Sequence, residues 1–234
     1  MAGDTKISII LPAYNEEANI ESAVKDIFNY MDGKGWDFEV IVVDDGSKDL
    51  TSEIVNRLRI EYKELNLIAH ERNLGYGKSI MDGFNAAKND LLFFTDSDRQ
   101  FKIESIGDMI ELTGEADIVV GYRINRQDPL IRLLLSWGFN IIVRFLFDIN
   151  VRDIDCAFKI FHKRIFDKVK VETTQFFFNT EVLAKAKYFG YSIKEVGVPH
   201  FPRQAGSSSV SPKYIPITVH ELQRIRKSIK NLTK

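Results

Sequence analysis

Short apolar runs alternate with stretches of helical periodicity along the first half of the chain. The apolar runs predict strands at Lys6–Leu11, Phe38–Val43, Leu67–His70, Leu91–Thr95 and Ile118–Gly121. Apolar residues spaced three and four apart predict helices over Glu16–Tyr30, from Asp49 onward and over Lys78–Lys88. Because the strands are apolar on both faces, this order predicts an α/β fold with a mostly parallel central sheet and helices on both faces.

The second half of the chain is less regular. Its pattern predicts strands at Ala157–Phe161 and Ser192–Val198 around a helix at Thr180–Phe189. A loop rich in Pro, Gly and Ser leads to Ile215–Leu232, where apolar residues line one face and Arg and Lys the other, which is typical of a basic amphipathic helix. We therefore expect one domain over residues 1–214, this helix over 215–234, and no transmembrane domain.

The most apolar segment, Leu130–Phe147, requires a separate interpretation. Its charge-free part runs only from Leu133 to Val143, which is shorter than the roughly 20 apolar residues of a membrane span. Two interpretations remain open. The helix is either buried in the protein, or it lies on a bilayer surface with Trp137, Arg132 and Arg144 as interfacial anchors.

Composition narrows the class of protein. The chain has 234 residues, 44% of them hydrophobic, and a formal net charge of -1. These values fit a globular domain and give no basic field for a nucleic-acid partner. The only cysteine, Cys156, excludes a disulfide within the chain, and the N-terminal segment does not read as a signal peptide. We expect a cytoplasmic protein.

Carboxylates follow two of the predicted strands, and strand ends are where α/β sheets bind ligands. Asp96-Ser97-Asp98 comes directly after Leu91–Thr95, and Gln100 follows at a spacing that adds a neutral oxygen. Such oxygen ligands suit Mg²⁺ or Mn²⁺. A triplet of this kind is common in solvated loops, so its place at a strand end is what indicates a metal site.

Two further strand ends carry candidates for binding a nucleoside. Tyr14 can stack on a base, and Glu16 and Asp45 can accept hydrogen bonds from a base or a ribose. The alternative is that these residues only end strands, form turns and cap helices. Asp44 in particular fits a turn.

Several motifs occur in an order that resembles the family 2 glycosyltransferases of GT-A fold. Within that family the chain is similar to the polyprenyl-phosphate (dolichyl-phosphate) mannose and glucose synthases. The resemblance covers about residues 6 to 210, and its motifs are Pro12-Ala13-Tyr14-Asn15-Glu16, Val42-Val43-Asp44-Asp45-Gly46-Ser47, Asn73-Leu74-Gly75-Tyr76-Gly77-Lys78, Asp96-Ser97-Asp98, Val120-Gly121-Tyr122-Arg123, Asp153–Phe161 and Glu195–Arg203.

The resemblance implies a role for each matching residue. The nucleoside would be held by Pro12, Tyr14, Glu16, Val43 and Asp45. Asp96, Ser97 and Asp98 would form the diphosphate and metal site, with Gln100 as a further metal ligand. Arg123 and Arg203 would lie near the donor phosphates, Arg203 on a mobile acceptor loop.

The implied reaction is metal-dependent, inverting transfer of a sugar from a UDP- or GDP-sugar to a polyprenyl phosphate. Asp153, Asp155 and Glu181 are the candidate bases, with Asp153 favoured because it opens its motif. A phosphate monoester has a second pKa of about 6, so this acceptor is already anionic and needs no base. A sugar or protein hydroxyl acceptor is the alternative, and it requires a base.

One departure from the family affects the choice of sugar. Mannose synthases often carry a lysine after the loop arginine, where this chain has Gly206-Ser207-Ser208-Ser209, so the resemblance does not fix mannose. We expect the protein at the cytoplasmic face of a membrane, attached peripherally. The aromatic run Phe176–Phe178 is assigned to the core or to a homodimer contact, with the lining of a path for the lipid as the alternative.

Overall fold

Seven strands form one sheet in the order β3-β2-β1-β4-β6-β5-β7. The computed structural model describes residues 5–126, 128–202 and 215–232. The strands are β1 (Lys6–Ala13), β2 (Asp37–Asp44), β3 (Leu65–Ala69), β4 (Leu91–Thr95), β5 (Ile118–Ile124), β6 (Phe158–His162) and β7 (Ile193–Pro199). β6 runs antiparallel to both of its neighbours, and all other pairs are parallel. The predicted mostly parallel sheet is confirmed.

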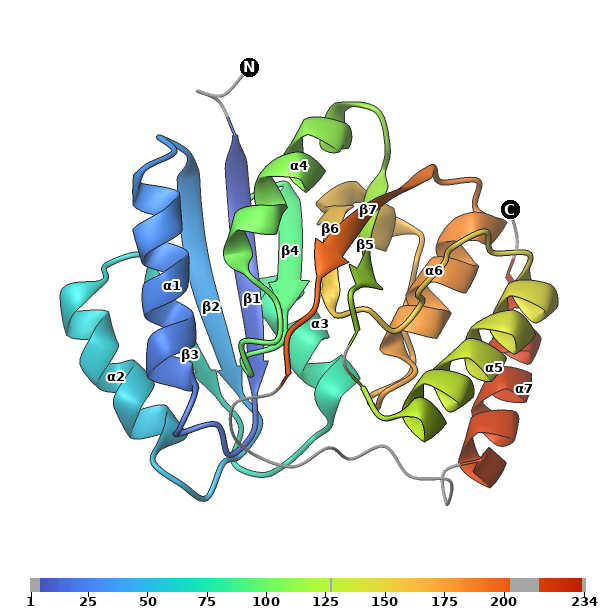
Figure 1. The fold of residues 1–234 in the computed structure, drawn as a ribbon, viewed down its shortest axis with the longest axis horizontal. Coiled ribbons are helices and arrows are strands. Elements are labelled where there is room, and N and C mark those ends of the chain that lie inside the picture. The colour runs from blue at the N-terminus through green and yellow to red at the C-terminus, as the bar shows by residue number, and fades with distance from the viewer. Residues whose placement is uncertain (1–4, 127, 203–214, 233–234) are drawn as a thin grey trace.

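Helices cover both faces of this sheet, as predicted (Figure 1). On one face lie α1 (Ile20–Asp32), α2 (Thr51–Glu61) and α4 (Ile106–Glu111), whose buried side chains share a core with Ile9, Val42 and Phe93. The other face is covered by α3 (Tyr76–Ala86), α5 (Leu130–Phe147), α6 (Phe178–Tyr188) and α7 (Ile215–Lys230). Short 3₁₀ turns occupy Ile103–Ser105, Leu112–Gly114 and Lys163–Asp167.

Residue spacing explains how these helices attach. In α1, Ile20, Val24, Ile27 and Met31 recur at helical intervals and are at most 3% exposed. Burial of each such side chain stabilises the fold by about 1.5–3 kcal/mol. In α3, Gly83 occupies a position that faces the sheet, and a Cβ added there would lie 2.6 Å from the Ile10 side chain. The missing side chain allows α3 to pack directly on β1.

The sheet brings the ends of several strands to one edge. β2, β1 and β4 are neighbours and parallel, so the loops after Ala13, Asp44 and Thr95 emerge side by side. In the reversed strand β6, the first residue Phe158 pairs with Thr95. β6 therefore begins at this edge, and the segment that precedes it lies there as well. β5 and β7 also end there. The described residues of the motifs noted in the sequence therefore converge at this edge.

Helix α5 is largely exposed, which argues against the interpretation that it is buried in the protein. Only Asn140 and Val143 are buried, whereas Leu130, Leu134, Trp137 and Phe145 are at least 60% exposed. The same helix is long and apolar enough to cross a membrane, judged by length and composition alone. It packs against α6 and α7 at the end of the molecule where the three helices gather (Figure 1).

The C-terminal helix α7 is integrated into this end of the domain. Leu222 and Ile225 are buried in the same core as α3 and α6, and Ile229 packs against it. Arg224 extends towards α6 and contacts Glu181 at 3.0 Å. This helix is amphipathic as predicted, and its apolar face covers the domain.

Candidate functional site

The loops after β1 and β2, which carry the candidate nucleoside-binding residues, are joined by hydrogen bonds. The Asn15 amide donates to Ser47 Oγ at 2.8 Å, and the Lys48 amide donates to Asn15 Oδ1 at 2.8 Å. The Glu16 amide donates to Thr51 Oγ1 at 2.9 Å. Beside this junction Tyr14 is 43% exposed, so its ring is available for stacking.

Asp45 is buried and organises the neighbouring Gly-rich turn. Its carboxylate accepts hydrogen bonds from the amides of Leu74 and Gly75, both at 2.8 Å. Gly75 has φ +105°, a conformation that favours glycine. A carboxylate has about four acceptor positions, so Asp45 retains capacity for a ligand while it holds this turn.

His70 links Asp45 to helix α3, a connection that the sequence motifs did not indicate. Its ring nitrogens lie 2.8 Å from Asp45 Oδ1 and 3.0 Å from Asp82 Oδ2. Lys78 forms an ion pair with the same Asp82. By contrast Asp44 accepts hydrogen bonds from Ser47 and Ser52, which matches the turn and cap role considered for it.

The Asp96-Ser97-Asp98 segment is tied to both neighbouring layers. Ser97 is buried and its hydroxyl donates to the Pro12 carbonyl at 3.0 Å, which fixes the turn to the end of β1. Tyr76 donates its hydroxyl to Asp96 Oδ1 at 2.9 Å. Burial, and then the negative charge of Asp96, raises the pKa of Tyr76 well above its usual value. Tyr76 thus remains a neutral donor that orients Asp96.

The residues of this segment fit a divalent metal. Asp96, Asp98 and the Gln100 side-chain oxygen would supply hard oxygen ligands, and the Gln100 side-chain nitrogen donates to the Phe201 carbonyl at 3.0 Å. Within the described ranges no group of three His, Cys, Asp or Glu residues could hold a metal ion. Mg²⁺ is commonly bound by one or two carboxylates together with substrate phosphates. The donor set matches that arrangement.

Arg123 and Asp153 form a two-point ion pair at the same edge of the sheet. Arg123 Nε lies 2.6 Å from Asp153 Oδ2, and Nη2 lies 2.7 Å from Oδ1. Burial alone would raise the pKa of Asp153, but the hydrogen bonds and charge of Arg123 hold that pKa below its usual value. Asp153 is therefore poorly suited to accept a proton and well suited to hold Arg123 in place.

Asp155, two residues further on, has the opposite character. Its side chain reaches solvent, yet the protein packed around the carboxyl displaces water. This burial, together with the negative charge of Asp153, raises the pKa of Asp155 to about 6. Of the two Asp residues in the motif, Asp155 is the one whose pKa is raised towards neutrality, whereas the sequence pattern favoured Asp153, and the identity of a base stays a prediction.

A buried lysine supports the turn that carries both Asp residues. Lys159 is fully buried on β6, and its ammonium donates to the Ile154 carbonyl at 3.0 Å and to the Cys156 carbonyl. Cys156 is buried beside it, and burial raises the pKa of its thiol to about 12. The cysteine is therefore inert, and Lys159 fixes the backbone between Asp153 and the strand.

A cluster of arginines surrounds a hollow next to Asp153. The hollow has a volume of about 220 Å³ and is lined by Arg123, Arg126, Arg144 and Arg152 together with Trp137 and Ile141 of α5. Nη2 of Arg126 is buried without a hydrogen-bond partner among the described residues. No carboxylate of the described chain lies within 4 Å of Arg144. The motifs had drawn attention only to Arg123.

The structure also describes His200 and Glu181. His200 is buried against Phe101, and burial, reinforced by the charge of Arg123, lowers its pKa to about 4, so it is neutral. Arg203 lies outside the described residues. Glu181, one of the candidate bases, is buried and binds the Thr173 amide, Lys185 and Arg224, so its contacts support the loop that precedes α6.

Comparison with known proteins agrees with this geometry. The family model described as Glycosyl transferase family 2 matches residues 8–172. The glycosyltransferase AglD of Haloferax volcanii is 31% identical over 212 residues, 86% of this chain and 34% of that protein. The human dolichyl-phosphate beta-glucosyltransferase is 28% identical over 217 residues, 82% of this chain and 66% of that protein. The chain thus spans one third to two thirds of the length of these relatives.

Solved structures share the fold. Glucosyl-3-phosphoglycerate synthase from Mycobacterium tuberculosis, crystallised with Mn²⁺, UDP and glucosyl-3-phosphoglycerate, superposes with a TM-score of 0.73 at 17% identity, covering 98% of this chain and 81% of that one. At this identity the match concerns the fold, which is the GT-A type that the motifs implied. Since the family model covers well over half of its residues, this chain belongs to glycosyl transferase family 2.

Proposed function

We propose that this chain transfers a sugar from a nucleoside-diphosphate sugar to a polyprenyl phosphate, with Mg²⁺ or Mn²⁺ as cofactor. The observation that carries the proposal is the arginine hollow, which joins the Asp153 segment to the exposed apolar face of α5. A polyprenyl phosphate combines an anionic head with a long apolar tail. The hollow and the helix face offer a complementary surface for each part.

The donor is assigned to the edge formed by β1, β2 and β4. Tyr14 stacks on the base, and Glu16 and Asp45 accept from the base or ribose. Asp96 and Asp98 hold the metal, with Gln100 as a further ligand, and the metal supplies charge that stabilises the leaving diphosphate. Arg123, locked by Asp153, contributes a fixed positive charge near the same phosphates.

The acceptor phosphate needs positive charge more than it needs a base. Near neutral pH it is largely a dianion, because its second pKa is about 6. We assign the orientation of the acceptor phosphate to Arg126 and Arg144. Arg203, which follows β7 in the sequence, is assigned to the same task. One phosphate oxygen forms a bond to the anomeric carbon while the bond from that carbon to the donor diphosphate breaks. Attack from the opposite side inverts the anomeric centre.

We place the protein at the cytoplasmic face of a membrane, where the acceptor lipid resides. The exposed apolar residues of α5 include Trp137, with Arg132 and Arg144 at the flanks. This composition is typical of a helix that lies in the interfacial plane of a bilayer. The relative named dolichyl-phosphate beta-glucosyltransferase supports the same acceptor class.

A direct assay tests the proposal. The protein is incubated with a short polyprenyl phosphate, Mn²⁺ and labelled UDP- or GDP-sugars, and the organic phase is counted. We expect label in the organic phase with either the UDP-sugars or the GDP-sugars. The rate of this transfer is expected to be at least tenfold lower for Arg144→Gln. Arg164→Gln, an exposed arginine paired with Asp117 far from the site, is the matched control. Absence of an extractable product with every donor would refute the lipid acceptor.

A hydroxyl acceptor is the second candidate, because Asp155 has the raised pKa that a general base requires. That reaction gives a water-soluble product and depends strictly on one carboxylate. Asp155→Asn separates the two functions. If Asp155→Asn retains turnover, the phosphate acceptor is supported. If the unsubstituted protein makes a water-soluble product and Asp155→Asn does not, the hydroxyl acceptor is supported.

A further inference from the structure

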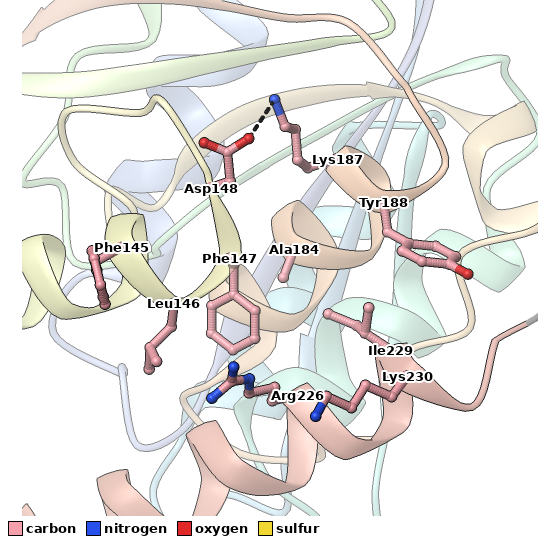
Figure 2. A pocket seen from close by; sticks show the side chains of 10 residues that line it. All are labelled: Phe145, Leu146, Phe147, Asp148, Ala184, Lys187, Tyr188, Arg226, Ile229 and Lys230. Carbon is pink, nitrogen blue, oxygen red and sulfur yellow. Dashed lines mark ion pairs between the residues drawn. The ribbon is translucent and has the colours of Figure 1, made fainter.

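A second groove lies at the far end of α5, between this helix, α6 and α7. It has a volume of about 450 Å³. Figure 2 shows Phe147 of α5, Ala184 of α6 and Ile229 of α7 around it, with Arg226 and Lys230 contributed by α7. None of these residues belongs to the donor or acceptor site described above.

The charge of this groove is unbalanced. Lys187 pairs with Asp148 at 3.3 Å, and that ion pair is drawn in Figure 2. Arg226 and Lys230 have no carboxylate within 4 Å among the residues that the structure describes, and both are exposed. Two cations side by side without a partner favour an anionic ligand.

Apolar surface adjoins these cations. Phe145, at the rim of the groove, is 87% exposed, and it continues a line of exposed residues along α5 that includes Leu134, Trp137 and Ile141. Trp137 and Ile141 also line the arginine hollow. A single apolar face of α5 thus runs along the arginine hollow, which α5 lines from Leu133 to Arg144, and reaches the groove at Phe145.

We propose that the α5–α6–α7 groove binds the phosphate headgroup of an anionic bilayer lipid, separate from the acceptor. A free phosphate would use Arg226 and Lys230 but would leave the exposed Phe145 and its neighbours in water. A lipid in a bilayer satisfies both, because its headgroup meets the cations while the acyl region covers the apolar face. Two contacts along one helix also fix the rotation of the domain, so that the arginine hollow faces the membrane.

Vesicle flotation at physiological ionic strength tests this inference. We expect the protein to float with phosphatidylcholine vesicles that contain phosphatidylglycerol and to bind pure phosphatidylcholine vesicles at least tenfold more weakly. A basic residue near an anionic surface contributes about 1 kcal/mol, which is roughly a fivefold change in affinity. Arg226→Gln/Lys230→Gln is therefore expected to weaken binding to the anionic vesicles about 10- to 30-fold.

The matched control removes the same charge elsewhere. Lys227 lies on α7 outside the groove and Lys63 follows α2, and both are exposed. Lys227→Gln/Lys63→Gln is expected to retain binding within about threefold, since neither side chain lines the groove and exposed charges beyond a Debye length are largely screened. Thermal unfolding verifies that both double variants are folded.

The outcomes separate the possible explanations. Equal loss in the two double variants would mean that net charge alone drives binding, and it would overturn the groove. Unchanged binding of Arg226→Gln/Lys230→Gln would overturn it as well. Inorganic phosphate that abolishes flotation at millimolar concentration would assign the cations to a free anion instead. Because flotation needs neither donor nor turnover, these results stand apart from the test of the transfer reaction.

Discussion

Asp153 and Asp155 are separated by one residue, but their surroundings predict different consequences of substitution. Asp153 is buried in a two-point ion pair with Arg123. Removal of one partner leaves an uncompensated buried charge, which costs about 3–5 kcal/mol. We expect Asp153→Asn to lower the free energy of unfolding by about 3 kcal/mol in urea denaturation.

Asp155→Asn is the control for this prediction, because Asp155 is solvent-exposed and has no ion pair among the described residues. The raised pKa of Asp155 means that its ionised form is disfavoured in the folded chain, so its substitution is expected not to lower the free energy of unfolding at neutral pH. Similar destabilisation by the two substitutions would contradict the assignment of Asp153 as the residue that positions Arg123.

The pH dependence of turnover distinguishes Asp155 from the acceptor. The pKa of Asp155 is raised to about 6, and the second pKa of an acceptor phosphate is also about 6. Both groups act when deprotonated, so kcat/KM rises with pH through this range in either case. With a phosphate acceptor, we expect the acidic limb to persist in Asp155→Asn. A flat profile for that variant would identify Asp155 as the base.

At the residue scale the sequence located the site but did not reveal the partners within it. The motifs placed Asp45, Asp96, Asp98 and Arg123 at strand ends, and the structure brings these strand ends to one edge. The contacts that define their roles join residues far apart, as between Asp153 and the Arg123 guanidinium. Such contacts depend on the fold and leave no local pattern.

At the scale of elements, the apolar pattern predicted every strand of the sheet to within a few residues. It did not predict that β6 is antiparallel, because alternation of side chains carries no strand direction. Helix α4 was missed because its six residues, Ile106–Glu111, are too few to show a period. The exposure of α5 could not be predicted either, since a buried helix and a membrane-surface helix share the same composition.

The exposure of α5 gives a prediction for that element. Leu134 is 60% exposed and Val143 is fully buried on the same helix. We expect Leu134→Ser to leave the free energy of unfolding within about 0.5 kcal/mol and Val143→Ser to lower it by about 2–4 kcal/mol. Thermal and urea unfolding of the two variants provide the measurement. Comparable losses would place the Leu134 face in an interface between protein chains.

At the scale of the whole molecule, the site is an assembly of loops that no single element holds. The turn after β4 is fixed to β1 by Ser97, and the turn after β2 is fixed to the start of α3 by Asp45. A ligand bound across these loops adds contacts that exist only in the folded chain. Donor binding should therefore raise the stability of the entire domain.

The size of this effect follows from mass action. A nucleoside diphosphate with Mn²⁺ at about 100 times its Kd stabilises the fold by about 2.7 kcal/mol. We expect this increment in a thermal shift assay with either UDP or GDP, and the nucleotide that produces it identifies the donor. Asp98→Asn removes a metal ligand and should abolish the part of the increment that depends on Mn²⁺. Asp32→Asn, an exposed carboxylate on α1, should retain it. If Mn²⁺ adds nothing to the stabilisation of the unsubstituted protein, the metal site at Asp96 and Asp98 is refuted.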